Sequence, residues 1–294
     1  MMRAITSALL FIVMLVAPDA VAATHYPVSG MIVSVDRASR TFTASIQAIP
    51  NYMQAMTMPF AVKAVKDLDG LVPGAIVEFT LVVDQQSSHA ERLRIVRYAN
   101  IEQDPFSASR LKLLSEIVGG AAAATKALTI GEAVPDFTLT DQQGRPLKMA
   151  DLRGKVVALN FIYTSCALPD FCLRLANNFG VLQKRFTAQL GRDLMLLTVT
   201  FDPTHDGPEV LARYAAQWGA DAATWRFLTG PVAEVQRVCH LFGVHAFPNE
   251  GLMDHSLHTV VIDRQGKLVA NIEGNQFTAT QLGDLTAGVL QRGK

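Results

Sequence analysis

A run of aliphatic, β-branched and aromatic residues from Val156 to Tyr163 leads into a short loop that holds Cys166 and Cys172. A run of this kind predicts a buried strand. Polar and apolar residues at helical spacing follow from Leu173 to about Leu190, which predicts a helix. The two thiols therefore lie at a strand-to-helix junction, where unpaired backbone N–H groups favour a thiolate. We expect the chemistry of the chain at this junction.

Strand and helix patterns alternate around this junction over residues 129–294. Apolar runs predict strands at 133–141, 147–149, 193–201, 225–228, 256–263 and 268–272. Apolar residues at helical spacing predict helices at 208–218, 232–242 and 280–292. Strands that alternate with helices and end in an antiparallel hairpin predict a thioredoxin-like α/β domain.

Residues 25–98 have a different pattern, with short alternating segments and no long helical one. Strands are expected at 28–36, 41–46, 60–62, 76–83 and 90–98. Five short strands in a segment of this length predict a small all-β barrel of the OB-like type. Residues 99–128 form the expected linker between the domains, and their apolar residues predict one amphipathic helix within it.

The first 22 residues have the three parts of a signal peptide. Arg3 precedes an apolar run from Ala4 to Ala17, and Ala20-Val21-Ala22 forms a small-residue cleavage site. An uncleaved membrane anchor is the alternative, but the run is short for a span of about 20 apolar residues. We therefore expect export to the periplasm, with the mature protein peripheral to the membrane.

The charge balance narrows the classes of partner. The 294-residue chain has 26 Lys and Arg residues and 26 Asp and Glu residues, so its formal net charge is zero. Such a balance gives no indication of binding to nucleic acid or to anionic membrane surfaces. Half of the residues are hydrophobic, so two domains can each bury a substantial core.

Cysteine and histidine supply the candidate chemistry of the second domain. An oxidising compartment favours thiol pairing, and three cysteines leave at least one unpaired. Cys239 falls on the expected apolar helix face of Val232, Val235 and Leu241, which favours a structural role for it. His255 directly precedes a predicted strand, so it is a candidate ligand or catalyst at a sheet end, with simple packing as the alternative.

Three methionines within six residues stand out in the first domain. Met56 and Met58 are two residues apart, so on a strand both side chains point to one face, and Met53 lies just before them. Thioethers are soft ligands that suit Cu(I) or Ag(I). The alternative is that these methionines fill gaps in the core.

Residues 26–98 resemble the CusF-type periplasmic copper-binding barrel in their strand pattern and in the segment Ala55-Met56-Thr57-Met58-Pro59-Phe60. In that family two methionines, a histidine on an earlier strand and an aromatic cap hold Cu(I). The resemblance assigns the two methionines to Met56 and Met58. The histidine position falls near Ser45 or Ile46 and the cap position at Met53, so the histidine is absent and Met53 offers a third sulfur.

Residues 129–292 resemble the SCO/SenC family. The similarity rests on five motifs, which are Asp136-Phe137-Thr138-Leu139, Gly154-Lys155-Val156-Val157, Phe161-Ile162-Tyr163-Thr164-Ser165-Cys166, Thr200-Phe201-Asp202-Pro203 and Asp254-His255-Ser256. The resemblance implies a thioredoxin-like fold and copper ligands Cys166, Cys172 and His255. It also implies assistance in assembling the dinuclear copper centre of cytochrome oxidase. The family spaces its cysteines as Cys-x3-Cys, whereas five residues separate them here, which alters the metal geometry and the strain of a disulfide.

Three functions are compatible with these residues. The first is a copper chaperone whose partner is the copper-bearing subunit of cytochrome c oxidase or another copper protein, because both domains carry soft ligand sets. The second is a periplasmic thiol-disulfide oxidoreductase or thiol peroxidase with Cys166 and Cys172 as the catalytic pair. The third is a scaffold that uses no metal. The chain lacks the Cys-x-x-Cys of ordinary disulfide reductases, which favours the first function.

Overall fold

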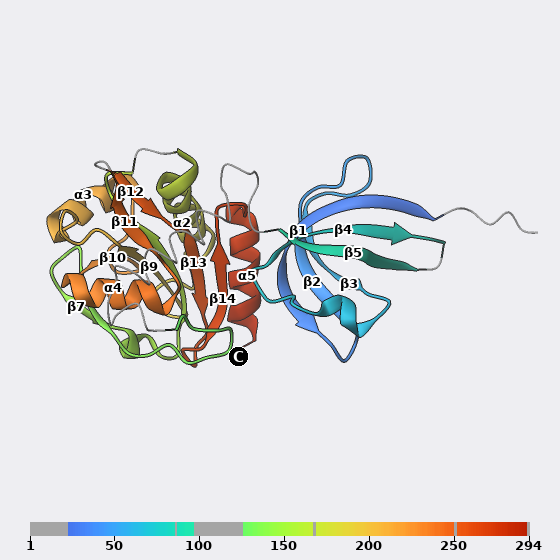
Figure 1. Cartoon of the computed structure of the whole chain (residues 1–294), viewed down its shortest axis with the longest axis horizontal. Coiled ribbons are helices and arrows are strands. Elements are labelled where there is room, and N and C mark those ends of the chain that lie inside the picture. Colours follow the sequence, from blue (N-terminus) through green and yellow to red (C-terminus); the bar gives the residue numbers. More distant parts are fainter. Residues whose placement is uncertain (1–22, 86, 97–125, 167–168, 250–251, 293–294) are drawn as a thin grey trace, which may run out of the picture.

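Two sheets organise the chain (Figure 1). The computed structural model describes residues 23–85, 87–96, 126–166, 169–249 and 252–292. A five-stranded sheet occupies the N-terminal part and a seven-stranded sheet occupies the rest, so the predicted fold class is confirmed. The predicted signal peptide and nearly all of the predicted linker, with its amphipathic helix, lie outside the described residues.

The first sheet is antiparallel throughout and has the order β3-β2-β1-β4-β5. Its strands are β1 (Thr24–Asp36), β2 (Thr41–Ile46), β3 (Met56–Ala61), β4 (Ile76–Val83) and β5 (Ser88–Val96). A bridge between Val62 and Ala90 joins the two edges and closes the barrel. The rings of Phe42, Phe60 and Phe79 pack inside it at centroid distances of 4.9–5.5 Å. Met56 and Met58 belong to β3, which begins four residues earlier than predicted, and Met53 precedes this strand.

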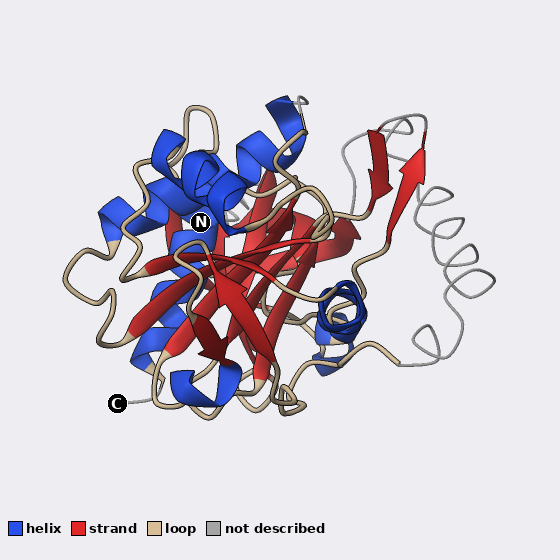
Figure 2. Ribbon diagram, turned by 90° about the vertical axis from the view of Figure 1, so that its left-hand side faces the viewer, coloured by secondary structure: helices blue, strands red, loops and turns tan. Residues whose placement is uncertain are grey.

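The second sheet has the order β14-β13-β8-β9-β10-β6-β7. Its strands are β6 (Thr138–Asp141), β7 (Pro146–Lys148), β8 (Val156–Ile162), β9 (Leu194–Thr200), β10 (Trp225–Thr229), β13 (His258–Ile262) and β14 (Leu268–Glu273). The helices are α2 (Arg174–Arg185), α3 (Pro208–Gln217), α4 (Val232–Leu241) and α5 (Ala279–Gln291). Strands β8, β9 and β10 are parallel and central, and helices lie on both sides of the sheet (Figure 2).

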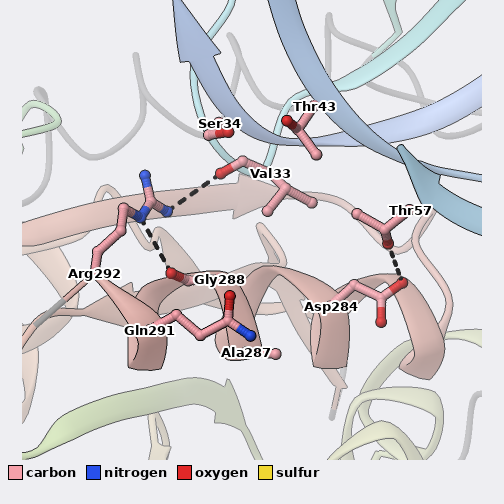
Figure 3. Close-up of a pocket in the computed structure, with 9 residues that line it drawn as sticks. All are labelled: Val33, Ser34, Thr43, Thr57, Asp284, Ala287, Gly288, Gln291 and Arg292. Carbon is pink, nitrogen blue, oxygen red and sulfur yellow. Dashed lines mark hydrogen bonds between the residues drawn. The ribbon is translucent and has the colours of Figure 1, made fainter. Parts of the chain in front are cut away.

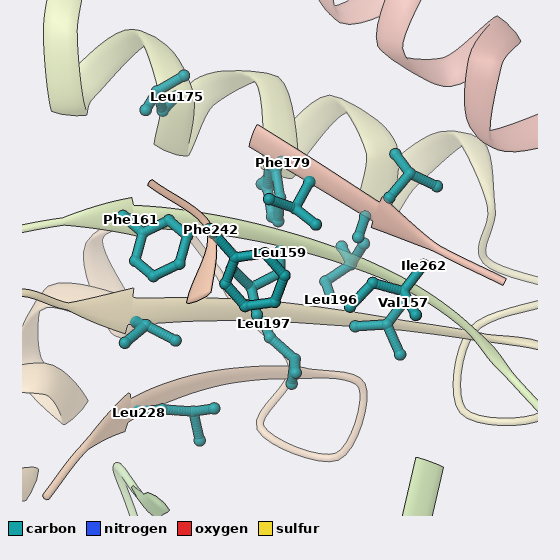
Figure 4. Close-up of a cluster of buried hydrophobic side chains, with 14 of the residues drawn as sticks. Val157, Leu159, Phe161, Leu175, Phe179, Leu196, Leu197, Leu228, Phe242 and Ile262 are labelled. Carbon is teal, nitrogen blue, oxygen red and sulfur yellow. The ribbon is translucent and has the colours of Figure 1, made fainter. Parts of the chain in front are cut away.

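Full burial of the central strands explains their continuous apolar sequences. Every residue of β8 and of β9 is buried, as expected for parallel strands covered on both faces. Leu175 and Phe179 of α2 pack on this layer, together with Phe242 (Figure 4). This packing fixes the end of β8, from which the cysteine loop departs, relative to the start of α2.

Several predicted boundaries are wrong. Helix α2 ends at Arg185 rather than near Leu190, and the first strand of the domain begins at Thr138 rather than at 133. Val232 is 47% exposed, so it does not share the buried face of Val235 and Leu241. The sequence also gave no indication of the two-stranded ribbon β11 (Ala246–Asn249) and β12 (Leu252–His255), which carries His255.

Helix α5 packs on α2 on one side and on β1 and β2 of the barrel on the other (Figure 1). Gly74 of the barrel adds a second contact, because a Cβ placed there would lie 2.9 Å from Ile272 of β14. The two domains thus share a packed interface. Within the described residues, no helix has the length and apolar content that crossing a membrane requires.

Candidate metal centre

The two cysteines flank the turn between β8 and α2. Strand β8 ends at Ile162, and the backbone N–H of Cys166 donates to the carbonyl oxygen of Tyr163 at 3.3 Å. Cys172 lies in a wide helical turn, Pro169–Leu173, that directly precedes α2. Neither thiol is in a disulfide, and both are buried, with exposed fractions of 4% for Cys166 and 0% for Cys172.

The described part of the chain brings one set of three His, Cys, Asp or Glu side chains into a geometry that suits a metal ion. The Sγ atoms of Cys166 and Cys172 and a ring nitrogen of His255 all lie within 4.8 Å of one another. Two donors bound to one ion at about 2.3 Å are at most about 4.6 Å apart. Three donors spread evenly around one ion at that bond length are about 4.0 Å apart, so these three need to approach by at most about 0.8 Å to share an ion.

Aromatic rings hold the imidazole of His255 over the cysteines. Its centroid lies 4.7 Å from that of Phe201, 5.7 Å from that of Tyr163 and 6.2 Å from that of Phe171. Nδ1 lies 3.2 Å from the carbonyl oxygen of Ser256. An Nδ1–H that donates there leaves the lone pair of Nε2 for a metal, which is the usual arrangement of a ligating histidine.

The electrostatics of Cys172 differ from the sequence expectation. The hydrogen bond with Cys166 and burial together raise the pKa of the Cys172 thiol far above its ordinary value. The expectation that the junction favours a thiolate is therefore wrong for Cys172. Burial and the nearby charge of Cys166 also raise the pKa of Tyr163. A bound cation can reverse this preference, because metal coordination deprotonates a thiol.

Asp206 is a structural part of the site that sequence reasoning missed. Its carboxylate, which is 1% exposed, accepts hydrogen bonds from the backbone N–H of Thr164 at 3.0 Å and from its hydroxyl at 2.5 Å. It also accepts from the Thr200 hydroxyl at the end of β9, at 2.6 Å. Asp206 therefore ties the start of the cysteine loop to β9. Its position four residues after Asp202-Pro203 was the available signal.

Cys239 and the buried His258 of the second domain lie outside this group. Cys239 is 6% exposed within α4, and burial alone raises its pKa to about 12. His258 is buried on β13, where its Nδ1 lies 2.8 Å from Oδ1 of Asn271. Both positions fit packing roles.

The three methionines lie in strand β3 of the barrel and just before it. Met56 and Met58 lie on the same face of β3, with Met56 48% exposed and Met58 half-buried against the core. Met53 is half-buried and pairs with Ile49 in an isolated bridge. Next to it in the sequence, Tyr52 stacks on Tyr26 with a centroid distance of 4.0 Å.

The strand register explains which residues face the methionines. On β2, Ile46 pairs with Met56 and Ala44 with Met58, so aliphatic side chains occupy this face. Ser45 pairs with Thr57 and points to the opposite face. The position at which the related barrels carry a histidine therefore offers no ligand here, and the soft donors of this face are the thioethers.

Comparison with known proteins identifies the family. A family model described as SCO1/SenC matches residues 126–289, more than half of the chain. The chain belongs to the SCO1/SenC family. In this SCO1/SenC protein, residues 25–94 match a second family model, described as "Copper binding periplasmic protein CusF". Both resemblances are confirmed, and copper is confirmed as the predicted cofactor.

Several curated proteins are similar to the SCO1/SenC part. The SCO1 protein homolog of Bacillus subtilis is 31% identical over 97 residues, which are 33% of this chain and 49% of that protein. A putative copper-binding protein of Stutzerimonas stutzeri is 28% identical over 145 residues, 48% of this chain and 69% of that protein. A SCO2-like protein of Rickettsia typhi is 30% identical over 150 residues, with the same coverages. The chain thus spans about half the length of the first relative.

Solved structures of SCO proteins also resemble this part. A SCO1/SenC family lipoprotein from Bacillus anthracis is 24% identical with a TM-score of 0.49, covering 56% of this chain and 99% of that one. Bradyrhizobium japonicum ScoI with copper bound is 25% identical with a TM-score of 0.46, covering 56% and 100%.

Proposed function

We propose that this SCO1/SenC protein is an exported copper chaperone that takes up copper through Cys166, Cys172 and His255. The observation that carries the proposal is the approach of two thiol sulfurs and one imidazole nitrogen to within 4.8 Å of one another. Two thiolates and an imidazole form a soft-to-borderline ligand set that suits copper. The copper-bearing subunit of cytochrome c oxidase, or another copper protein, is the proposed acceptor.

The residues around the group have distinct roles in this proposal. Cys166 and Cys172 lose their thiol protons as copper binds, so uptake releases protons. The backbone carbonyl of Ser256 orients His255, and the rings of Tyr163 and Phe201 keep water from the group. The raised pKa of the Cys172 thiol favours reprotonation as copper leaves, which helps transfer to an acceptor with a better ligand set.

The rest of the chain supports this reading. The barrel matches a copper-binding family and has two thioethers on one face of β3, with Met53 just before the strand, so both domains carry candidate ligands for the same soft metal. We assign the barrel to residues 25–98 and the SCO1/SenC domain to residues 129–294, with export to the periplasm through the signal peptide of residues 1–22.

Cu(I) stoichiometry of the full mature chain tests the proposal. We expect the loss of one tightly bound Cu(I) in Cys166→Ser and in Cys172→Ser, and weaker binding in His255→Ala. Cys239→Ser is the matched control, because it removes a buried thiol outside the group. Unchanged copper content in both Cys166→Ser and His255→Ala would sink the proposal.

A second candidate function follows from the same two sulfurs. Cys166 and Cys172 are close enough to form a disulfide by a small movement, and their oxidation to a disulfide releases two electrons and two protons. Cys166 would attack a substrate disulfide, because Cys172 is fully buried and its pKa is raised. Reduction of a model disulfide that requires Cys166 and is unaffected by copper chelation would favour this function over copper delivery.

A further inference from the structure

Three polar side-chain atoms are buried in the elements next to the proposed copper ligands and have no hydrogen-bond partner among the described residues. They are Oδ1 of Asn160, Nδ2 of Asn178 and Oγ1 of Thr259. Asn160 and Thr259 are 0% exposed and Asn178 is 5% exposed. A buried polar group without a partner is costly in free energy, and an internal water molecule commonly supplies the missing hydrogen bonds. The positions of the three atoms decide whether one water fits all of them.

The strand register brings Asn160 and Thr259 side by side. Asn160 of β8 and Thr259 of β13 are partners in an antiparallel pair. Side chains of such partners lie on the same face of a sheet, with Cβ atoms about 4.5–5.5 Å apart. That face is the one covered by α2, because Nδ2 of Asn160 donates to the backbone oxygen of Leu175 at 3.4 Å. Oδ1 of Asn160 and Oγ1 of Thr259 therefore share the space under α2.

Asn178 borders the same space from the helix. It lies three residues after Leu175 on α2 and is buried. Helical side chains tilt toward the N-terminus, so the amide of Asn178 lies over the turn of Leu175, which Asn160 reaches from β8. Arg174, four residues before Asn178 on the same side of α2, donates to the backbone oxygen of Phe277 at 3.3 Å. Asn178 therefore faces the interior between α2, β8 and the segment before α5.

The three atoms offer the hydrogen bonds that one water molecule needs. Nδ2 of Asn178 can only donate, Oδ1 of Asn160 can only accept, and the Thr259 hydroxyl can do both. None of the three is within hydrogen-bond distance of another, whereas a water bridges polar atoms about 4–5.5 Å apart through two bonds of ordinary length. A water that accepts from Asn178 and donates to Asn160 and Thr259 makes three hydrogen bonds, the usual number for a buried water.

Each of the three residues lies on an element next to one of the proposed copper ligands. Asn160 is in β8, which leads to the first cysteine, Asn178 is in α2, which follows the second cysteine, and Thr259 is in β13, which follows the histidine. The spacing of these three elements sets the spacing of the three ligands. A water bound to all three side chains therefore links the elements whose separation determines whether the ligands converge.

We propose that Asn160, Asn178 and Thr259 bind an internal water molecule that holds β8, α2 and β13 at the spacing in which the two sulfurs and the imidazole approach one another. The three side chains are positioning residues, because they act on the site through the elements that carry the ligands. The water site depends only on the hydrogen-bonding groups of the interior, and its effect on copper rests on the proposed function.

A high-resolution crystal structure of the reduced, metal-free mature chain tests the water directly. We expect density for one water within about 3.2 Å of Oδ1 of Asn160, Nδ2 of Asn178 and Oγ1 of Thr259. Direct hydrogen bonds among these side chains, or apolar side chains that fill the space between them, would overturn the inference.

Two substitutions at Thr259 separate the hydroxyl from its packing. Thr259→Val keeps the shape and removes the hydroxyl, whereas Thr259→Ser keeps the hydroxyl and removes a methyl group. Amide hydrogen exchange in the first turns of α2 should be about fivefold faster in Thr259→Val, the factor that one hydrogen bond is worth, and close to wild type in Thr259→Ser. Thr286→Val is the matched control, because the buried Thr286 hydroxyl bonds to the backbone oxygen of Leu282 within α5. Exchange at the wild-type rate in Thr259→Val, or faster exchange in Thr259→Ser than in Thr259→Val, would refute the role of the water.

Cu(I) affinity is the functional readout. Thr259→Val should bind Cu(I) about fivefold more weakly at unchanged stoichiometry, since a smaller fraction of the chains holds the ligands in the binding arrangement. Wild-type affinity in this variant would show that the water does not position the ligands. A wild type that takes up no Cu(I) would refute the proposed function instead, while the crystal structure and the hydrogen exchange would still decide on the water site.

Discussion

Asp206 is not one of the candidate metal ligands, but it helps to fix the position of the cysteine loop that carries them. Its buried carboxylate accepts three hydrogen bonds, two from Thr164 and one from Thr200. Thr164 is two residues before Cys166, so the position of the first sulfur depends on this acid. A buried carboxylate is stable only when such donors satisfy it.

Replacement of Asp206 by Asn should destabilise the fold and loosen the cysteine loop. An amide accepts through one oxygen only, so at least one donor loses a charge-assisted hydrogen bond, at a cost of about 3 kcal/mol in the free energy of unfolding. Urea denaturation measures this loss. Thr200→Val, which removes one of the three donors, should cost about 1 kcal/mol. Equal stability of Asp206→Asn and wild type would contradict this account.

Cys239 provides the opposite case, a thiol that serves packing. Replacement by Ser places a hydroxyl in its apolar site on α4, which should lower the free energy of unfolding by about 1–3 kcal/mol. Cu(I) uptake should stay at the wild-type stoichiometry. Loss of copper from this variant, with the fold intact by circular dichroism, would show that the described group is incomplete.

The sequence predicted the candidate metal ligands better than the residues that position them or the domains. Thiols and imidazoles have few alternatives to metal or redox chemistry at a strand end, so Cys166, Cys172 and His255 stood out. Phe201 and Asp284 did not, because an aromatic ring or a carboxylate acquires its role only from neighbours that are distant in the sequence. Asp284 meets Ser45 across 239 positions, and no local pattern records such a pair.

At the scale of elements, long apolar runs predicted the buried strands correctly, whereas the two short strands with mixed polar and apolar residues were missed. The seven residues of β8 and of β9 are all buried, so their sequences are unambiguous. Strands β11 and β12 have four residues each, and Pro248 interrupts the pattern in the first. Their pairing places His255 beside aromatic residues that are distant from it in the sequence.

Helix α5 should lose its hold on the barrel at low pH. Burial alone would raise the pKa of Asp284, but the hydrogen bonds from Ser45, Arg185 and Thr57 outweigh burial and lower it. The pKa of Asp284 is lower in the docked state than in the free state, so its ionised carboxylate stabilises docking at pH values above about 3.9, the ordinary Asp pKa. This contribution to docking is lost as the pH falls through the lowered pKa.

Scattering profiles recorded from neutral pH to below pH 4 check this expectation. The radius of gyration should rise at the acidic end in the wild type before the far-ultraviolet circular dichroism changes. Asp284→Asn cannot titrate at this position, so its radius of gyration should show no such step. A step of the same size in both proteins would assign the effect to another group.

At the scale of the whole molecule, one chain carries two copper-type ligand sets, one in each domain. One consists of thioethers on the barrel and the other of two thiols and an imidazole in the SCO1/SenC domain. The contact between the two domains could not be read from the sequence, because it depends on how α5 meets β1–β3 (Figure 3). The two family resemblances predicted the fold and the candidate ligands of each domain separately, but they contained no information on the contact between the domains.

A substitution at Gly288 tests the contact between α5 and the barrel without changing any charged residue. Its backbone is ordinary helix, and a Cβ there would lie 2.8 Å from Val33. Gly288→Leu should therefore strengthen α5 itself by roughly 0.8 kcal/mol of helix propensity and yet separate the domains. The readouts are helix content by circular dichroism and the radius of gyration. Gly180→Leu on α2, where no atom lies within 4 Å, is the control. An unchanged radius of gyration in Gly288→Leu would contradict the described packing.

The place of α5 in the chain has a consequence for biogenesis. This helix follows every other described element, yet it holds the strands that come first. Ribosomes add about 5–20 residues per second, so the barrel strands have emerged well before Asp284 is made. The barrel must then complete its sheet with Ser45 and Thr57 still hydrated. Docking of the barrel on the second domain therefore cannot begin before α5 has been made.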